Sequence, residues 1–503
     1  MDPMIYFYIL VGLPLVASPI VYLTGRLSIR RGGVLGISLA RALTIFFLLV
    51  EMGLLALVLQ SAIQTGSVYM AVGEVTLLFD GIGFLMAAVV LVLGLMVALF
   101  SVPYMTDERN EEKFFALLLI TIGSIIGLVM SFDLFNLWVW FEVMAISTYF
   151  LVAFYNEQSA SLEAGVKYLV QSAVGSALVL FGIAILFAQT GTTDMQSIWM
   201  LTPETGKLSA LGGMLLIVGF GVKTAIVPLH TWLPDAHSQA PSGISAMLSG
   251  IVIEAGMVAM LRSLSLMGKI TVPWGAVLLG FGCLNILVGN LMALRQKQVK
   301  RLLAYSSVAQ VGYMLLGFGF SLQFSLMDGA SGGFFHLITH AMMKGLAFLA
   351  AGALLYALYL SKGEHSPLMI DDLNGASRKY PLVAFALSAA VLGLGGLPPF
   401  AGFMSKWQIL AAGVETQNTL MIIIVIFAGL NSVLSLAYYA PIVNHMYRRE
   451  VSSAVEAGNR IPWLMVVPLV IFTLAIVIVG VWPSSMIFIT QNAGYSLLYT
   501  FFN

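Results

Sequence analysis

One nine-residue stretch, HLITHAMMK, carries side chains suited to moving protons. It spaces His336, His340 and Lys344 four residues apart, so on an α-helix they form one stripe about 12 Å long. Neutral imidazole accepts a proton at one nitrogen while donating from the other, and its ordinary pKa near 6.5 allows transfer in both directions. A lysine shielded from water releases its proton more readily than a solvated one. The stripe therefore predicts a proton relay.

The same spacing has two other interpretations. His336 and His340 could hold zinc, but the next turn offers the Lys344 cation where a third ligand is wanted, which disfavours a metal site. Alternatively the stripe is structural, with each histidine satisfied by a backbone carbonyl.

Two further lysines adjoin stretches that should interrupt a helix. GFGVKTAIVPLHTWLPDAHSQAPSG places three prolines after Lys223, and LGLGGLPPFAGFMSKW places two prolines and several glycines before Lys406. Proline removes a backbone donor, which lipid tolerates only where protein or water satisfies the freed groups. Similarly interrupted segments in the two halves of a transporter point to internal repeats and to the transport path. Simple packing kinks are the other interpretation.

Two carboxylates also fall inside apolar stretches. Glu142 lies in FDLFNLWVWFEVMAISTYF, where burial disfavours a charged carboxylate, so it is a candidate proton donor and acceptor. A fixed ion pair holding two helices together is the alternative, with Lys223 as the natural partner. Glu254, in SGIVIEAGMVAMLR, could counter Lys223 or Lys344, or bind a cation.

Three polar residues follow the Lys223 break in PLHTWLPDAH, namely His230, Asp235 and His237. They could feed protons into the path. Alternatively they cap exposed helix ends, because Asp and His can satisfy the free backbone groups there.

Other charges within or beside the spans are assigned lesser roles. Glu163 and Lys167 are four residues apart and could simply neutralise one another. Arg41 and Glu51 are isolated in the second predicted helix, where we expect them to pack against a neighbouring subunit.

The elements that position these residues must be membrane helices. The 503 residues are 60% hydrophobic and 9% charged, with a mean hydropathy of +0.97, which leaves too little polar surface for a water-soluble fold. Apolar runs of about 18 to 25 residues follow one another, each long enough for a membrane helix and unlike the short alternating strands of a barrel. Asp2 precedes the first run, so we predict a retained helix and not a cleaved signal peptide. The prediction is an all-α polytopic membrane protein of about 14 helices with a short tail. The predicted helices are centred near residues 14, 50, 90, 121, 143, 177, 217, 252, 283, 310, 344, 394, 432 and 476.

Charge in the loops predicts the orientation. Loops after odd-numbered helices carry most of the Lys and Arg residues, including Lys297, Lys300 and Arg301. By the positive-inside rule these loops face the cytoplasm, and an even helix count places both termini on the outer face. Inside the spans a charge costs about 2.5 to 3.5 kcal/mol at mid-bilayer, so the buried lysines should face a partner or a hydrated cavity.

Several kinds of chemistry are disfavoured in this chain. Cys283 is the sole cysteine, which excludes an intrachain disulfide and a cysteine-ligated iron–sulfur cluster within the chain. The net charge is zero with no basic tract, so nucleic acid is not an expected partner. The sequence has no phosphate-binding glycine loop and no nucleophile elbow. We therefore expect neither a cofactor nor a metal in this chain.

Five segments resemble one family over essentially the whole chain. They are FDLFNLWVWFEVMAISTYFLVA, VKTAIVPLHTWLPDAHSQAPSGISAMLSG, RLLAYSSVAQVGYMLLG, HLITHAMMKGLAFLAAG and GLPPFAGFMSKWQIL. They are similar to the antiporter-like membrane subunits of complex I, of membrane-bound hydrogenases and of Mrp sodium/proton antiporters. The resemblance implies 14 helices with two inverted five-helix repeats, each containing a broken helix. In this single membrane domain it suggests N-terminal helices at 1–113, repeats at 114–265 and 266–446, and a C-terminal helix at 447–503.

The resemblance also implies roles for individual residues. Glu142 and Lys223 correspond to an input ion pair, His336, His340 and Lys344 to a central relay, and Lys406 to a terminal lysine. A charge change in a neighbouring subunit would separate the input pair, and protons would then pass to Lys344 and Lys406 and leave on the outer side.

Two departures from the family pattern are visible. Glu254 occupies a position where many relatives carry a lysine, which reverses the local sign and leaves room for cation binding. The long lateral C-terminal helix of the largest complex I antiporter subunit has no counterpart, so the chain resembles the shorter subunits.

The implied function is proton translocation within a complex I-like respiratory oxidoreductase, of the NADH-quinone oxidoreductase or membrane-bound hydrogenase type. The chain would lie in a prokaryotic inner membrane beside other membrane subunits, and any iron–sulfur cluster, flavin or nickel–iron centre is expected in partner subunits. The main alternative is an Mrp-type Na⁺/H⁺ antiporter subunit without redox coupling. A scaffold whose buried charges serve only assembly and a quinone-binding subunit are less favoured.

Overall fold

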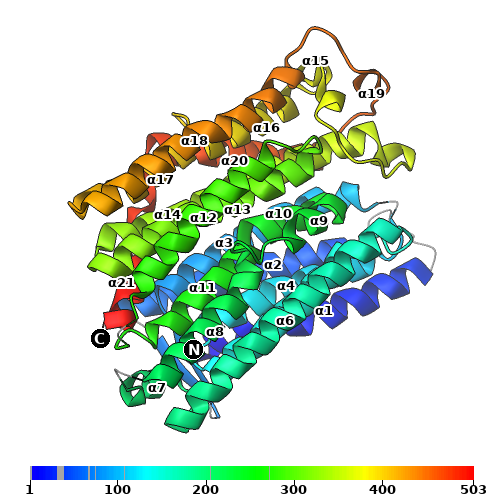
Figure 1. Cartoon of the computed structure of the whole chain (residues 1–503). Helices are drawn as coiled ribbons and strands as arrows, with labels where there is room; N and C mark the ends of the chain where they lie inside the picture. The colour runs from blue at the N-terminus through cyan, green and yellow to red at the C-terminus, as the bar shows by residue number, and fades with distance from the viewer. Residues whose placement is uncertain are drawn as a thin grey trace.

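The computed structural model describes residues 3–30, 39–65, 68–73, 75–106, 108–203, 206–270 and 272–502. Long helices lie side by side through this part of the chain (Figure 1). Thirteen of the described helical segments are long and apolar enough to cross a membrane. They are α1 Pro3–Arg30, α2 Leu39–Thr65, α3 Gly81–Tyr104, α4 Glu111–Met130, α5 Leu134–Val152, α6 Ser159–Thr190, α8 Lys207–Thr224, the continuous segment Ser242–Ser265, α12 Trp274–Ala293, α13 Val299–Phe324, α14 Met327–Leu358, α18 Thr419–Met446 and α20 Trp463–Val481. The predicted all-α membrane fold is confirmed.

Both predicted helix interruptions are present. After α8 ends at Thr224, the chain turns before α9 (Trp232–Gln239). The span predicted near residue 394 is divided into α16 (Pro381–Gly395) and α17 (Ala401–Glu415), of 15 residues each, so neither half reaches across a bilayer alone. The division into two inverted repeats, with the boundaries given above, stays a prediction.

The eighth predicted span contains a local change of helix type. It begins as α10 (Ser242–Met247), continues as a π-helical turn, η1 (Leu248–Val252), and resumes as α11 (Ile253–Ser265). A π-helical turn inserts an extra residue per turn and so changes the direction of the side chains that follow it.

Several small elements connect the spans. A β-hairpin of β1 (Val68–Val72) and β2 (Val75–Phe79) pairs antiparallel with Val68 opposite Phe79, and nothing in the sequence analysis anticipated it. The short helical connections are α7 Met195–Leu201, η2 Leu360–Lys362, η3 Asp371–Leu373, α15 Ala376–Lys379, α19 Ser453–Glu456 and η4 Pro483–Met486.

The expected short tail is instead a helix, α21 (Ile487–Phe502). Its buried residues include Ala493, Leu497 and Phe501, and it packs on α3, α11 and α14. The Gly81 N–H at the start of α3 donates to Ser496 Oγ at 3.1 Å. The tail prediction was wrong because this apolar stretch buries one face against the bundle and does not need to cross the membrane.

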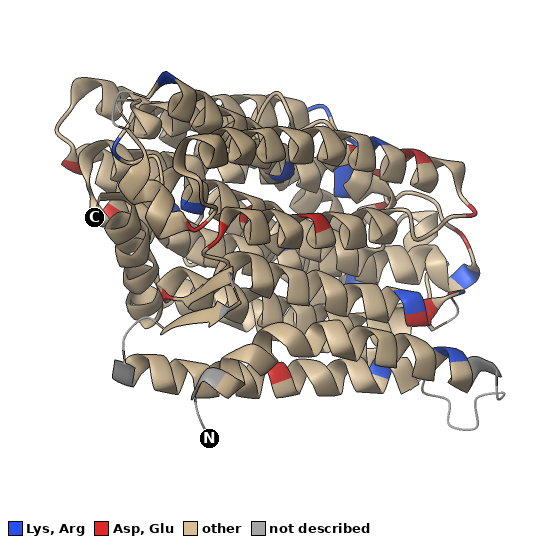
Figure 2. Ribbon diagram, turned by 90° about the horizontal axis from the view of Figure 1, so that it is seen from below, with Lys and Arg blue, Asp and Glu red and all other residues tan. Residues whose placement is uncertain are grey.

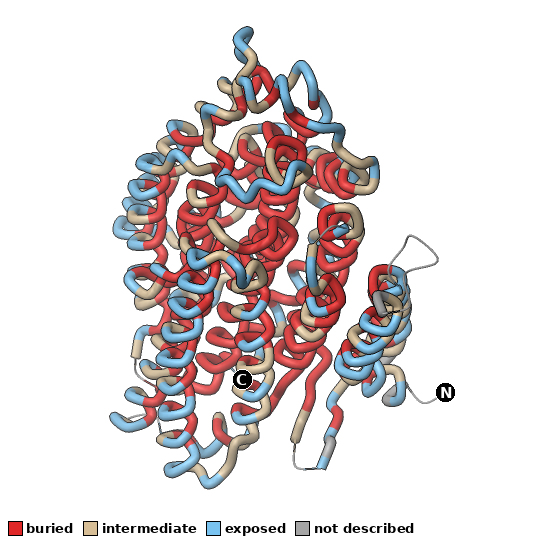
Figure 3. The backbone as a smooth tube through the Cα atoms, turned by 90° about the vertical axis from the view of Figure 1, so that its right-hand side faces the viewer, coloured by how far each residue is buried: buried red, intermediate tan, exposed pale blue. Residues whose placement is uncertain are grey.

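Burial separates a central group of helices from the peripheral ones. Figure 3 shows buried backbone in the interior and exposed backbone around it. The segment Ser242–Ser265, α13 and most of α14 are buried, whereas α1, α2 and α18 expose much of their apolar surface. In Figure 2 the blue Lys and Arg and the red Asp and Glu residues occupy a small part of a ribbon that is otherwise tan. Ionisable residues on the central helices must therefore find partners inside the protein.

One buried ion pair has a structural role. Arg262 of α11 donates to Asp80 at 2.7 and 3.2 Å, and both side chains are almost fully buried. Asp80 also caps α3 by accepting from the Gly83 N–H at 2.8 Å. The pair fixes α11 to the start of α3.

Breaking this pair should destabilise the protein. Asp80→Asn leaves the Arg262 cation buried without its counter-charge, which typically costs about 3 to 5 kcal/mol. We expect a lower thermal unfolding temperature of the purified complex and less assembled complex in membranes. Glu157→Gln is the matched control, because Glu157 pairs with Arg109 on the surface with both side chains exposed. Equal unfolding temperatures for the two variants would contradict the assignment.

The expectation for the two charges of α2 was wrong. Arg41 is not isolated, because its Nε donates to Glu111 of α4 at 2.9 Å in a buried ion pair. Glu51 is fully buried inside the chain, and neither of its oxygens has a hydrogen-bond partner among the described residues. Both lie on the inward stripe of α2, so neither faces a neighbouring subunit.

Candidate functional site

The first broken helix ends in a part of the protein that satisfies its freed backbone groups. Asn285 of α12 accepts the Val227 N–H at 2.8 Å, and the Trp232 indole donates to the Val222 carbonyl at 2.7 Å. Side chains thus replace the helical hydrogen bonds that are lost at the break. This arrangement holds Lys223, in the last turn of α8, in a fixed position.

Neutral groups surround the Lys223 ammonium. It is 1% exposed and donates to Thr148 Oγ1 of α5 at 3.1 Å and to the Tyr168 hydroxyl of α6. The Tyr168 ring centre lies 4.5 Å from the ammonium, and the Tyr168 ring stacks on Trp232 with 4.0 Å between the ring centres. A cation held by hydroxyls and an aromatic ring is not locked by a counter-ion.

Glu142 lies near Lys223 without pairing with it. The two are close enough to interact electrostatically, but no hydrogen bond or ion pair joins them. Glu142 is partly exposed on α5, and its Oε1 is buried with no hydrogen-bond partner in the described structure. The alternative of a fixed ion pair holding two helices is therefore wrong, and the input ion pair implied by the resemblance is likewise not formed in this structure.

The second broken helix positions Lys406 in a comparable way. Its ammonium donates to the Leu394 carbonyl at 2.8 Å and to Ser432 Oγ at 3.1 Å, and it lies 4.4 Å from the centre of the Tyr313 ring. The Leu394 carbonyl is free for this because α16 ends one residue later. The chain then turns at Gly396 with φ of 83°, a left-handed conformation that glycine adopts without strain.

His336 of α14 connects to the same carbonyl. Its Nδ1 is hydrogen-bonded with Ser405 Oγ at 2.9 Å and its Nε2 with Gln310 Oε1 at 3.1 Å. Gln310 in turn donates to the Leu394 carbonyl at 2.9 Å. His336 and Lys406 are thus linked through Gln310 and one shared acceptor.

His340 is paired with Glu254. The His340 Nδ1 lies 2.6 Å from Glu254 Oε1, and both side chains are fully buried. The second Glu254 oxygen and the His340 Nε2 have no partner among the described residues. The His336 and His340 rings are 6.2 Å apart. Glu254 therefore meets a histidine and not Lys223 or Lys344, because the π-helical turn before it directs its side chain toward α14.

Lys344 completes the group. Its fully buried ammonium donates to the Leu303 carbonyl at 2.7 Å and to Ser306 Oγ, both on α13. Like the other two buried lysines it has neutral partners only. We call the whole set the buried row; it comprises Lys223, Glu254, His340, Lys344, His336, Gln310 and Lys406.

The two alternatives for the histidine stripe can now be judged. The histidines are hydrogen-bonded to side chains and not to backbone carbonyls, so the structural alternative was wrong in that detail. Across the described ranges, no group of three His, Cys, Asp or Glu side chains is arranged to hold a metal ion.

The residues assigned lesser roles form a surface network. Lys167 pairs with Glu163 at 2.7 Å and with Asp235 at 3.1 Å, and Asp235 also binds Arg301 at 2.9 Å. Glu163 and Lys167 do neutralise one another. Asp235 pairs with the Lys167 and Arg301 side chains and caps no helix end, so the helix-capping alternative is wrong for Asp235.

Removal of the Lys167 charge should have little effect. Surface ion pairs contribute about 1 kcal/mol or less, so Lys167→Gln is expected to leave ion uptake by the complex within about twofold of wild type. Uptake by vesicles containing the assembled complex measures this. A loss of uptake as large as that of a buried lysine variant would show that Lys167 is part of the transport path.

Two histidines beyond the first break are more buried than expected. His230 is almost fully buried beside Tyr305. His237 is fully buried, stacks on Phe348 at 4.6 Å, and neither ring nitrogen has a described partner. It lies within electrostatic range of Lys300 and Lys344, between the loop side and the buried row.

Sequence reasoning missed Lys300. It was assigned to a surface cluster, but it is 4% exposed and its ammonium donates to the Ala240 carbonyl. No helical repeat in the sequence marks Lys300 as buried, because α13 is buried on every side. The neutral residues Thr148, Tyr168, Ser306, Gln310 and Ser405 were also missed, because polar uncharged side chains are common in membrane helices.

Comparison with known proteins identifies this arrangement. Residues 131–432, more than half of the chain, match the family described as "NADH:quinone oxidoreductase/Mrp antiporter, TM", and residues 69–115 match "NADH-Ubiquinone oxidoreductase (complex I), chain 5 N-terminus". The chain belongs to the NADH:quinone oxidoreductase/Mrp antiporter family. The resemblance predicted from the five sequence segments is confirmed.

Individual members of this antiporter family match along most of their length. F420H2 dehydrogenase subunit N of Methanosarcina mazei is 31% identical over 439 residues, which cover 86% of this chain and 87% of that protein. NADH-quinone oxidoreductase subunit N of Myxococcus xanthus is 33% identical over 426 residues, covering 78% and 80%. A chain of the membrane-bound sulfane sulfur reductase, an archaeal respiratory membrane complex, superposes with a TM-score of 0.87 at 29% identity and 98% coverage of both chains. This chain is thus an antiporter-like membrane subunit.

Proposed function

We propose that this subunit translocates protons within a complex I-like respiratory oxidoreductase. The buried row carries the proposal, because it places three buried lysines with neutral partners beside two hydrogen-bonded histidines, His340 with Glu254 and His336 with Gln310, inside the central helices. The names of the relatives, subunits of an F420H2 dehydrogenase and of NADH-quinone oxidoreductases, support redox partners. The iron–sulfur, flavin or nickel–iron centres would lie in those partners, beside other membrane subunits.

In this proposal each lysine acts as a temporary proton carrier. Lys223, Lys344 and Lys406 are held by hydroxyls and carbonyls that accept from an ammonium. The hydroxyl partners can also donate to a neutral amine, so the site accommodates both protonation states. A proton then passes along the row from Lys223 to Lys406, with water bridging the gaps between groups that no direct hydrogen bond joins.

Glu142 is the proposed receiver of the driving signal. It is partly exposed on α5 and is not paired with Lys223, so a charge in a neighbouring subunit can act on it. A change there alters the field at Lys223 and so the affinity of the row for its first proton. The roles of the separate residues follow the family pattern stated above, except that Glu142 and Lys223 act on one another at a distance and not as an ion pair.

We further propose that loops after odd-numbered spans face the cytoplasm, with both termini outside, in a prokaryotic inner membrane. On that side His237 and Lys300 lie between the surface network and Lys344, which supports a route for protons from the cytoplasm. Their burial with few partners suits groups that exchange protons more than groups that fix helices.

The second candidate is an Mrp-type Na⁺/H⁺ antiporter subunit without redox coupling. The family itself includes Mrp antiporters. Glu254 favours this candidate, because one of its buried carboxylate oxygens has no described partner and is free to bind a cation.

Ion uptake by sealed vesicles that contain the intact complex tests the proposal. Uptake of protons that starts on addition of an electron donor and does not require sodium supports the redox-driven function. Transport that responds only to an imposed ion gradient, and that exchanges sodium for protons, supports the Mrp-type alternative. The same assay on Lys223→Met, with assembly checked, decides whether this chain carries the ion.

A further inference from the structure

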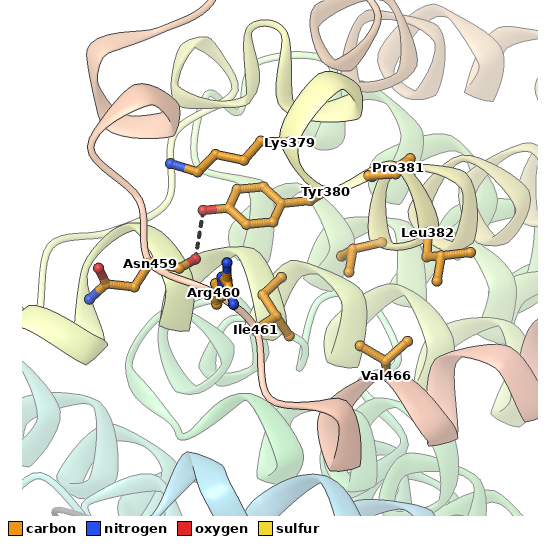
Figure 4. A pocket seen from close by; sticks show the side chains of 9 residues that line it. Lys379, Tyr380, Pro381, Leu382, Asn459, Arg460, Ile461 and Val466 are labelled. Atoms are coloured by element: carbon orange, nitrogen blue, oxygen red, sulfur yellow. Dashed lines mark hydrogen bonds between the residues drawn. The ribbon is translucent and has the colours of Figure 1, made fainter.

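A pocket of ≈ 410 Å³ opens between the starts of α16 and α20. Figure 4 shows Lys379 and Tyr380 on one side and Asn459 and Arg460 on the other. Below these polar groups the lining is apolar and includes Ile461 and Val466. The pocket is remote from the buried row, and the proposed function does not use it.

The polar rim of the pocket is positively charged. Lys379 donates to the Val455 and Glu456 carbonyls at 3.0 and 2.8 Å, which fixes its ammonium at the rim. Arg460 is exposed and has no hydrogen bond or ion pair with any described residue. The rim therefore holds one anchored cation and one free guanidinium, with no carboxylate among its lining residues.

One hydrogen bond gives the pocket a defined shape. The Tyr380 hydroxyl donates to the Asn459 carbonyl at 2.8 Å and so joins the two segments that form the walls. The first turn of α16 lies at the same place, and its N-cap residue Tyr380 makes no side-chain cap. Free N–H groups there add to the attraction for an anion.

The apolar side of the pocket continues onto the outer surface of the bundle. Leu382 is 61% exposed and Trp463 is 71% exposed, and beyond them Phe385 and Val470 are exposed further along α16 and α20. The cations at the margin match the phosphate of a phospholipid, and the aromatic residue beside them is typical of the headgroup level. The apolar surface that continues toward mid-membrane matches the acyl chains.

We propose that this pocket binds an anionic phospholipid. Its phosphate lies against Arg460 and Lys379, and an acyl chain follows Leu382 and Val466 along the two helices. An acidic segment of another protein would match the cations but would leave the apolar surface without a matching partner, so the lipid fits both parts of the site. The bound lipid would also hold the start of α16, whose other end supplies the Leu394 carbonyl to Lys406.

Photocrosslinking of the purified intact complex tests this. The complex is reconstituted with phosphatidylglycerol that carries a photoreactive acyl chain, or with the matching phosphatidylcholine, and the labelled peptides are identified by mass spectrometry. Peptides covering residues 379–385 and 460–470 should be labelled at least about fivefold more by phosphatidylglycerol, since each basic residue near the surface contributes a factor of about five.

Arg460→Gln should lower this phosphatidylglycerol labelling about fivefold while the complex stays assembled. Arg449→Gln, which removes an exposed arginine of the same loop region outside the pocket, should leave it unchanged. Equal labelling by the two lipids, or no effect of Arg460→Gln, would overturn the proposal. A photoreactive residue placed at Leu382 that crosslinks only to a protein subunit would also overturn it and would assign the pocket to a subunit interface.

Discussion

Lys223→Met is expected to reduce ion uptake by the intact complex about a hundredfold or more, because in the proposed relay Lys223 takes up and releases the proton. Methionine approximates the length of the lysine side chain without its charge. Lys223 donates only to Thr148 and Tyr168, so its removal breaks no hydrogen-bonded ion pair. Assembly should therefore survive, and the loss should appear in transport. Lys406→Met, which removes a donor to the Leu394 carbonyl and Ser432, should behave in the same way.

The measurement is donor-driven uptake by sealed vesicles, divided by the amount of assembled complex. Lys167→Gln serves as the matched lysine control, because Lys167 lies in the surface network. If Lys223→Met and Lys406→Met transport at the control rate, the buried lysines are structural. If both variants fail to assemble, their charges serve the scaffold role instead, and the relay is wrong.

Glu254→Gln is expected to slow uptake about tenfold to a hundredfold. Glutamine keeps the size of the side chain and can keep a hydrogen bond with His340, but it cannot exchange a proton. The variant therefore tests whether the Glu254 carboxylate exchanges a proton or only positions His340. His340 remains in place because its neighbours on α14 are unchanged.

The same vesicles give the rate for Glu254→Gln, and Glu163→Gln is the control because its carboxylate is 67% exposed and pairs on the surface. If Glu254→Gln takes up ions at the wild-type rate, Glu254 is not part of the proton path. A variant that loses only the dependence on sodium would instead assign Glu254 to a cation site and favour the Mrp-type alternative.

The sequence predicted the spans, both helix interruptions and the ionisable residues of the row, since charge and proline are costly in lipid and stand out against apolar runs. It did not predict which residues meet. Glu254 was expected near a lysine and instead pairs with His340. The direction of its side chain depends on a π-helical turn, and no local pattern of LSGIV predicts that turn.

Burial on all sides explains the other errors. Helix α13 is buried on all sides although it carries several polar residues, so no exposed face marks the inward one, and the sequence predicted a surface position for Lys300. Arg41 was thought isolated because its partner Glu111 lies 70 residues away, on α4. α21 was taken for a tail because an apolar helix that packs across the ends of other spans has no distinctive composition.

In the proposed relay, the depth of the buried row determines where the membrane voltage acts. Glu142 and Lys344 lie near the middle of α5 and α14, and Glu254 lies near the middle of the continuous segment Ser242–Ser265. Lys223 and the Lys406 ammonium lie at helix breaks. A charge that moves along the row stays at a nearly constant depth, so it crosses little of the electric field. The full work, about 2.3 kcal/mol per charge for each 100 mV, falls on the two short steps between the row and the aqueous phases. Voltage should therefore oppose loading and release, while lateral transfer proceeds almost unaffected by it.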